Sequence, residues 1–440
     1  MPQIELLAAE IQDLRPVRAI GRVEAIARGI VTVAGLGRQA TLGDSVRISC
    51  QGRAALAGEI VGLAPDRVDV LPMGDAGGVA LGDRVVLTGQ GGIAPGEGWI
   101  GRIVDPTGQP LDDRALPRGP VERPLLAPPP PAARRRLLGA RLDTGLAVMD
   151  TLLPLVRGQR IGLFAGSGVG KSSLLGRLAR DVAADVVVIG LVGERGREVR
   201  DFVERVLGPD GMARAVLVTA TSDQSPLMRR RCAWAAMTVA EHFRDEGKQV
   251  LLLVDSITRF AEAHREVALA GGEPATLRGF PPSTAHQIMA LAERAGPGPE
   301  GAGDITAIFS VLVAGSDMEE PVADILRGVL DGHIVLDREI AERGRFPAID
   351  VLRSVSRALP EAASEDENRL IGRARRLLGA YERVELMLRA GLYSPGSDPL
   401  IDAAVAVWPA LDAFFAESAP AAAASFARLA AVLGPPPPGP

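Results

Sequence analysis

The 440-residue sequence is poor in aromatic residues and in cysteine. It contains 3 Trp, 2 Tyr and 10 Phe residues, so its core must be built mainly from aliphatic side chains. Its two cysteines, Cys50 and Cys232, lie far apart in different kinds of segment. This pair excludes a disulfide scaffold and a cysteine-rich metal site, and it suits a reducing cytosol.

Long apolar runs and a surplus of basic residues are also missing. No run of 18 apolar residues occurs, so we expect no membrane-spanning helix. The first five residues lack a basic region followed by an apolar stretch, so we expect no signal peptide and a cytoplasmic protein. The formal net charge of −5 argues against a general nucleic-acid binder. The length favours two or three domains.

The first 17 residues contain a short amphipathic pattern. Ile4, Leu7, Ile11 and Leu14 recur at helical spacing within residues 3–14. A helix this short is marginal alone and must pack on something. Two interpretations stay open: the helix packs on its own domain, or residues 1–17 bind a partner protein.

Residues 18–125 are typical of a small β domain. Short apolar runs, from Ile30–Val33 to Ile100–Val104, are separated by Gly, Pro or Asp turns, which favours a barrel or sandwich. The first aromatic residue of the chain is Trp99. The earlier strands therefore lack the aromatic platforms on which nucleic-acid bases stack. We predict a structural role for this domain and no nucleic-acid partner.

A polyproline run at 128–131, followed by three arginines, indicates a domain boundary. Within residues 126–358, continuous apolar runs alternate with helical patterns, which is typical of buried parallel strands in a doubly wound α/β domain. The runs are Ile161–Ala165, Val186–Val192, Ala215–Ala220, Val250–Val254 and Ile305–Val313. The helical patterns are Lys171–Ala184, Glu198–Leu207, Pro226–Glu246 and Ser283–Ala295. For residues 359–433 we predict a helical domain, with helices at Asn368–Leu388 and Ile401–Phe415. For residues 434–440 we predict a disordered tail.

A glycine-rich loop follows the first of these strands and opens the first helix. Such a loop turns its backbone N–H groups toward a phosphate, and the helix N-terminus adds partial positive charge. Lys171 would reach the β- and γ-phosphates, and the Ser172 hydroxyl would ligate Mg²⁺. The usual pattern has Gly where this chain has Ala165, which is a mild change. The predicted ATP-binding residues are Ala165, Gly166, Ser167, Gly168, Val169, Gly170, Lys171, Ser172 and Ser173.

Two acidic residues stand at the ends of predicted strands. Asp255 ends the run Val250–Val254, and Glu194 follows the run Val186–Val192. Strand ends of a parallel sheet face the same crevice as the loop. Asp255 would hold Mg²⁺ through water, and Glu194 would polarise the water that attacks the γ-phosphate. The alternative for Glu194 is a surface ion pair with Arg195 or Arg197.

Several segments resemble a known ATPase family. Residues 157–173, 193–195, 251–260 and 354–357 are similar to the family shared by rotary ATP synthase subunits, the Rho helicase and type III export ATPases. Longer motifs resemble the flagellar export ATPases: 224–231, 271–274, 278–283, 327–338 and 393–400. One departure lies at Thr284–Met289, where the family more often has bulky apolar residues and a proline. The resemblance, over roughly residues 20–415, implies a RecA-like P-loop ATPase core, a small N-terminal β-barrel and a C-terminal helical domain.

The resemblance also implies residue roles. Glu194 matches the catalytic carboxylate of the family, with Arg195 beside it. Arg357 matches an arginine finger that reaches the γ-phosphate of a neighbouring subunit, and Phe346 matches the aromatic residue that stacks on adenine. The alternatives are a surface arginine for Arg357 and ordinary core packing beside Pro347 for Phe346.

One chain thus holds both the catalytic residues and the assisting arginine, which predicts a homo-oligomer, by resemblance a hexamer. The implied function is Mg²⁺-dependent ATP hydrolysis that energises flagellar type III export, releases substrates from chaperones and delivers them to the export gate. The implied partner of the N-terminal helix is a regulatory stalk protein, and the implied location is peripheral to the inner membrane. The alternatives are an injectisome ATPase, a Rho-like RNA translocase and a non-catalytic rotary subunit.

Overall fold

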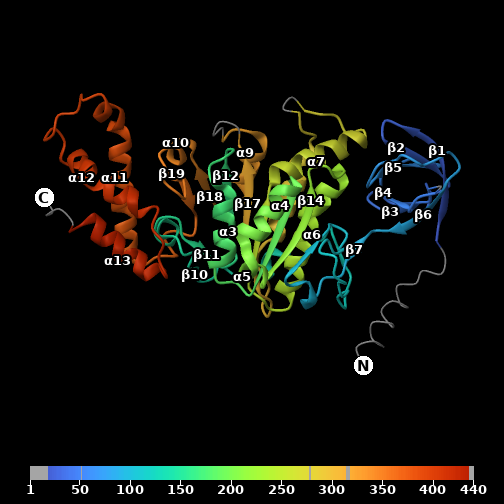
Figure 1. Cartoon of the computed structure of the whole chain (residues 1–440), viewed down its shortest axis with the longest axis horizontal. Coiled ribbons are helices and arrows are strands. Elements are labelled where there is room, and N and C mark those ends of the chain that lie inside the picture. Colours follow the sequence, from blue (N-terminus) through green and yellow to red (C-terminus); the bar gives the residue numbers. More distant parts are fainter. Residues whose placement is uncertain (1–17, 51, 277–278, 314–317, 436–440) are drawn as a thin grey trace.

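The computed structural model describes residues 18–50, 52–276, 279–313 and 318–435. Along its longest axis lie a β-barrel, a central sheet covered by helices, and a group of C-terminal helices (Figure 1). This arrangement confirms the predicted α/β core with an N-terminal barrel and a C-terminal helical domain. The amphipathic segment 3–14 lies outside the described residues.

Six antiparallel strands close the barrel. Around it they follow the order β1 (Ile20–Ala27), β2 (Ile30–Ala34), β5 (Arg67–Pro72), β4 (Leu56–Leu63), β3 (Ser45–Ile48) and β6 (Arg84–Gly89). Alternate residues such as Val31, Val33 and Val70 point inward and are fully buried. Aliphatic side chains therefore fill the barrel interior.

The segment between the barrel and the α/β core corrects one prediction. β8 (Arg102–Val104) pairs in parallel with β14, so the strand predicted at Ile100–Val104 belongs to the central sheet and not to the barrel. The cause is packing, because Trp99 is 2% exposed and lies in the same apolar cluster as the core helices. The short elements nearby are β7 (Gly92–Ile93), η1 (Glu97–Trp99), β9 (Arg123–Pro124), η2 (Ala132–Arg134), β10 (Arg141–Leu142) and β11 (Leu155–Val156).

The central sheet runs in the order β19-β18-β12-β17-β15-β13-β14-β8. Its strands are β12 (Arg160–Ala165), β13 (Val186–Glu194), β14 (Ala215–Thr221), β15 (Val250–Asp255), β17 (Asp304–Leu312), β18 (Gly332–Leu336) and β19 (Ile349–Ser356), with the short β16 (Gly296–Pro297) beside β17. The five predicted runs are all strands of this sheet, and they pair in parallel. Leu251 and Leu253 pack on one face while Leu252 packs on the other. Both faces are buried, as continuous apolar runs predict.

Helices cover the two faces of the sheet (Figure 1). On one face lie α3 (Lys171–Asp181), α4 (Gly196–Asp201), η3 (Phe202–Leu207) and α5 (Gly208–Met212). On the other lie α6 (Pro226–Asp245), α7 (Ile257–Ala270), α8 (Ser283–Arg294) and α9 (Pro321–Val329). The sequence analysis did not predict α7, α9, β18 or β19. Among the helices described, none is long and apolar enough to cross a bilayer.

Three helices form the C-terminal unit: α11 (Glu365–Arg389), α12 (Pro399–Phe414) and α13 (Ala422–Leu433). They pack, together with α2 (Ala147–Thr151), on the α3 face of the core, and α10 (Arg338–Glu342) precedes them. Ser364 and Glu367 form a capping box that starts α11. Gly434 and Pro435 were predicted to be disordered, but their carbonyl oxygens accept hydrogen bonds from Arg373. Residues 436–440 lie outside the described part.

Candidate nucleotide-binding site

The glycine-rich loop joins β12 to α3 as predicted. Gly168 and Gly170 have φ angles of +77° and +87°, a backbone conformation that favours glycine. Ala165 is the last residue of β12, and its side chain is fully buried in the apolar core. A methyl group therefore fits where the usual loop pattern has glycine.

The loop borders a cavity of about 840 Å³ at the carboxyl edge of the sheet. All nine predicted loop residues line it, together with Glu194 and Arg195. Further lining residues are Gly193, Glu198, Ser222, Thr258, Arg259, Glu262, Leu312, Val313, Glu320 and Arg338. Of these, Arg259 and Arg338 add cationic charge that the sequence analysis did not assign.

The charged groups predicted from separate strands meet at Lys171, which lines this cavity together with Glu194, whereas Asp255 is buried and is not among the described lining residues. The Lys171 ammonium contacts Asp255 Oδ1 and lies 3.9 Å from Glu194 Oε1. The Lys171 side chain is only 12% exposed, and that of Asp255 is 5% exposed. One buried cation thus lies between two carboxylates at the N-terminus of α3, where a phosphate group would also be attracted.

Glu194 differs from an ordinary surface carboxylate. Burial, and then the negative charge of Asp255, raise its pKa to about 7, while the charge of Lys171 opposes this shift. Arg195 pairs with Glu198 at 3.2 Å, and Arg197 pairs with Asp201 at 3.8 Å. The alternative of a surface ion pair between Glu194 and these arginines is therefore wrong. A carboxylate with a pKa near neutrality is suited to accept a proton.

The donor set fits Mg²⁺. The Ser172 hydroxyl lies in the first turn of α3 and lines the cavity, and the Asp255 carboxylate at the end of β15 contacts the neighbouring Lys171. Both offer hard oxygen ligands, and Mg²⁺ typically uses one or two such groups together with phosphate oxygens and water. Within the described residues there is no cluster of three or more His, Cys, Asp or Glu side chains, so the protein alone does not build a closed metal cage.

Phe346 lies beside the loop and is not a core residue. It is 51% exposed, and a side chain at Gly170 would lie 3.2 Å from its ring. The alternative of ordinary core packing beside Pro347 does not agree with this exposure. The position leaves one face of an aromatic ring available next to the phosphate loop.

Arg357 lies at the opposite edge of the sheet. Its neighbour Ser356 pairs with Gly332 at the start of β18, whereas Leu336 at the end of β18 pairs with Ala165 before the loop. Gly332 and Leu336 are four residues apart along β18, so the end of the sheet beside Arg357 lies roughly 13 Å from the end beside the loop. Arg357 is not among the described residues that line the cavity. Its exposed guanidinium donates to the Arg327 carbonyl, so it is not positioned to act on the nucleotide site of its own chain.

The structure also reveals residues that the sequence analysis missed. Ser310 is fully buried in β17, and its hydroxyl donates to Asp255 Oδ1 at 2.6 Å. Arg259 lies against Gly193, next to Glu194. The available signals were a serine near the end of the apolar run 305–313 and a cation four residues after Asp255.

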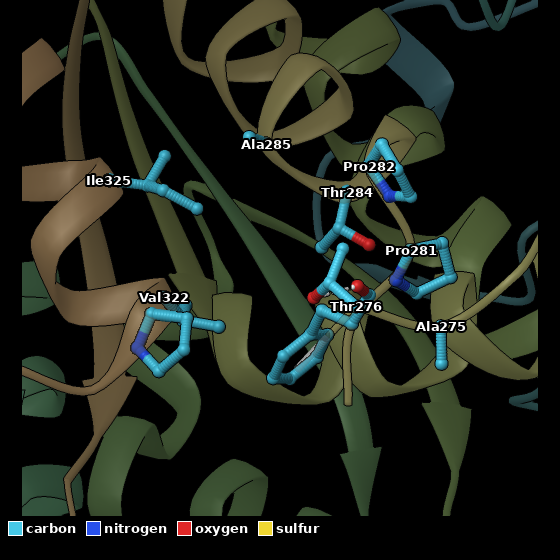
Figure 2. Close-up of a pocket in the computed structure, with 10 residues that line it drawn as sticks. Ala275, Thr276, Pro281, Pro282, Thr284, Ala285, Val322 and Ile325 are labelled. Carbon is cyan, nitrogen blue, oxygen red and sulfur yellow. Dashed lines mark hydrogen bonds between the residues drawn. The ribbon is translucent and has the colours of Figure 1, made fainter. Parts of the chain in front are cut away.

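A second hollow, of about 700 Å³, has a different character (Figure 2). It lies between residues 275, 276 and 280–282 on one side and helices α8 and α9 on the other, and none of the described residues that line it is charged. Thr284 and Ala285, from the divergent segment 284–289, stand on its wall in the first turn of α8. The described lining is thus apolar or uncharged, in contrast to the cavity beside the phosphate loop.

Comparisons with known proteins agree with this geometry. Residues 145–356 match the family model of the ATP synthase alpha/beta nucleotide-binding domain, and residues 363–431 match that of the T3SS EscN ATPase C-terminal domain. The chain is 44% identical to the flagellum-specific ATP synthase of Caulobacter vibrioides, covering 93% of this chain and 94% of that protein. It is 41% identical to the type 3 secretion system ATPase of Xanthomonas euvesicatoria, covering 91% and 90%.

Solved structures give the same result. The assembled ATPase EscN of enteropathogenic E. coli superimposes with a TM-score of 0.86 at 37% identity, covering 94% of this chain and 100% of that chain. EscN in complex with its central stalk EscO gives a TM-score of 0.85. Fold and site together define a nucleotide-binding protein of the ATP synthase α/β class. Within that class, the chain belongs to the family of flagellar type III export ATPases.

Proposed function

We propose that this protein is a Mg²⁺-dependent ATPase that works as a homohexameric ring and energises flagellar type III protein export. The observation that carries the proposal is the meeting of Lys171, Glu194 and Asp255 around the phosphate loop. Lys171 binds the β- and γ-phosphates, which draws its ammonium away from Asp255. Glu194 then orients the attacking water and accepts its proton, which its raised pKa favours.

Ser172 and Asp255 would hold Mg²⁺, Asp255 through water. When bound, the ion would supply positive charge that stabilises the negative charge on the phosphate oxygens. Phe346 stacks on the adenine ring, since it presents an exposed aromatic face next to Gly170. Arg195 is 81% exposed at the rim of the cavity, and we assign it to the outer phosphate contacts.

Arg357 acts in a neighbouring copy. It lies far from the cavity of its own chain and is exposed, which supports action across an interface between subunits. A ring built from one kind of chain places each Arg357 against the next cavity. EscN, the structural relative, is described as an assembled ATPase.

The decisive experiment mixes two inactive variants, Lys171→Ala and Arg357→Ala. Lys171→Ala loses nucleotide binding, and Arg357→Ala lowers turnover by about 10³-fold because it removes charge stabilisation in the transition state. In mixed rings, some interfaces join an intact Lys171 to an intact Arg357, so ATPase activity partly returns. A mixture that demonstrably co-assembles but stays inactive would contradict action in trans.

A separate variant tests the catalytic carboxylate. Glu194→Gln keeps the shape of the side chain and removes its basicity, so it should bind ATP and fail to hydrolyse it. Turnover by Glu194→Gln at the normal rate would contradict its assignment. The matched control is Glu204→Gln, which changes a 56%-exposed carboxylate on η3 that pairs with Arg200.

The export partners belong to the same proposal. Residues 1–17 bind a regulatory stalk protein, and the ring receives substrates from chaperones and hands them to the export gate, peripheral to the inner membrane. EscN was solved with its central stalk EscO, which supports a stalk partner. A second candidate, an injectisome ATPase, is favoured by the relative from Xanthomonas euvesicatoria. Deleting the gene and scoring flagella against effector secretion separates the two.

A further inference from the structure

We propose that Ser310 is a positioning residue that holds the Asp255 carboxylate in the orientation needed to bind Mg²⁺ with the nucleotide. The inference rests on the proposed function, because it assigns Asp255 to the metal. It adds a residue on a neighbouring strand whose hydroxyl touches neither ATP nor the metal.

The contact is short, buried and directed at one oxygen. Ser310 Oγ donates to Asp255 Oδ1 at 2.6 Å, and both residues are almost completely inaccessible to water. The Lys171 ammonium contacts the same oxygen. Asp255 Oδ2 is thus the oxygen that faces neither donor, and it is the one left for a metal-bound water.

The Ser310 hydroxyl is held by the sheet and not by a flexible loop. β15 and β17 pair in parallel, with Val254 opposite Phe309, which brings Ser310 level with Asp255. Beyond this pair, the Leu312 N–H donates to Thr258 Oγ1 at 2.9 Å and ties the end of β17 to the first turn of α7. The backbone is therefore held both before and after Ser310, which keeps the Ser310 hydroxyl beside Asp255.

Ser310 becomes more important when ATP is bound. The Lys171 ammonium then binds the phosphates, so Asp255 Oδ1 loses one of the two groups that donate hydrogen bonds to it. The Ser310 hydroxyl remains and keeps Oδ1 turned away from the metal position. Hydrogen bonds that orient a metal ligand in this way typically change metal affinity by about 10- to 100-fold when they are removed.

The test measures metal binding directly. Mn²⁺ is the probe, because it shares the oxygen-ligand preference of Mg²⁺ and its free form is counted by electron paramagnetic resonance. Full-length wild type, Ser310→Ala and Ser310→Thr are titrated with Mn²⁺ in the presence of saturating ADP, and ADP affinity is measured separately in EDTA. The matched control is Thr219→Val, which removes a hydroxyl of a 3%-exposed residue that donates to the Leu191 carbonyl at 3.4 Å.

We expect Ser310→Ala to weaken Mn²⁺ binding by roughly tenfold with metal-free ADP affinity and melting temperature close to wild type. Ser310→Thr keeps the hydroxyl and should restore most of the Mn²⁺ affinity, and Thr219→Val should match wild type. Equal Mn²⁺ affinity in Ser310→Ala and wild type would overturn the inference. An equal loss of ADP affinity in EDTA would also overturn it, since the effect would then be structural.

A parallel variant separates this inference from the proposed function. Asp255→Asn should lose most of the Mn²⁺ affinity. If Asp255→Asn binds Mn²⁺ normally, the metal role of Asp255 itself is wrong. If Asp255→Asn fails while Ser310→Ala behaves as wild type, only the role of Ser310 is wrong.

Discussion

Replacing Glu194 by glutamine should make the ligand-free protein more stable at alkaline pH. Burial raises the pKa of Glu194 from 4.5 to about 7, so between these pH values the folded state keeps a proton that the unfolded chain has lost. The free energy of unfolding must therefore fall as the pH rises through this window. Glutamine has no such proton, so the variant escapes the loss.

The size of the effect follows from the shift. Each pKa unit corresponds to about 1.4 kcal/mol, and the rise of the Glu194 pKa from 4.5 to about 7 limits the cost of ionisation to ~3 kcal/mol above pH 7. The attraction of the Lys171 ammonium, 3.9 Å away, is already included in this pKa, and only the part of the cost that develops between pH 5 and pH 8 contributes to the difference. We expect the stability advantage of Glu194→Gln to widen by roughly 2 kcal/mol between pH 5 and pH 8.

The assay is thermal unfolding of both proteins without nucleotide at pH 5, 6, 7 and 8. A 2 kcal/mol change corresponds to a melting temperature difference of roughly 4–8 °C for a domain of this size. Glu204→Gln, which changes a 56%-exposed carboxylate on η3 that pairs with Arg200, is the matched control and should show a pH-independent difference from wild type. If Glu194→Gln melts in parallel with wild type at every pH, the carboxylate carries no ionisation cost, and the electrostatic basis for its role as a base is wrong.

Three further predictions concern activity and the barrel. kcat/KM for ATP should rise about tenfold between pH 6 and pH 8, because it reports the free-enzyme pKa of Glu194; a flat profile would contradict this. Phe346→Ala should raise KM for ATP about tenfold with kcat nearly unchanged, since stacking on a base contributes ~1–3 kcal/mol; steady-state kinetics measure both. Glu59→Gln should lower the free energy of unfolding in denaturant by about 3 kcal/mol, because Glu59 on the barrel is the buried partner of Arg230 and Arg231 on α6. Unchanged stability would contradict a stabilising role for this contact between the barrel and α6.

The sequence by itself determined the phosphate loop and the five apolar strands of the sheet. Both depend on local patterns: glycines at positive φ before a helix, and continuous apolar runs that fit strands buried on two faces. The same reasoning placed Glu194 and Asp255 at one edge, because parallel strands end together. The same patterns predicted a small β domain before the α/β core and a helical domain after it, the resemblance added the RecA-like class of the core, and the fold confirmed this arrangement.

Only the tertiary structure decided which side chains meet. It moved Ile100–Val104 into the central sheet, because Trp99 finds its apolar partners there. It placed the Ser310 hydroxyl against Asp255 across 55 residues of sequence, and it put Phe346 beside Gly170 while Arg357 lies at the far edge. These contacts are set by the order and register of the strands. Strand order and register depend on the burial of apolar side chains from the whole chain, so no local sequence pattern predicts them.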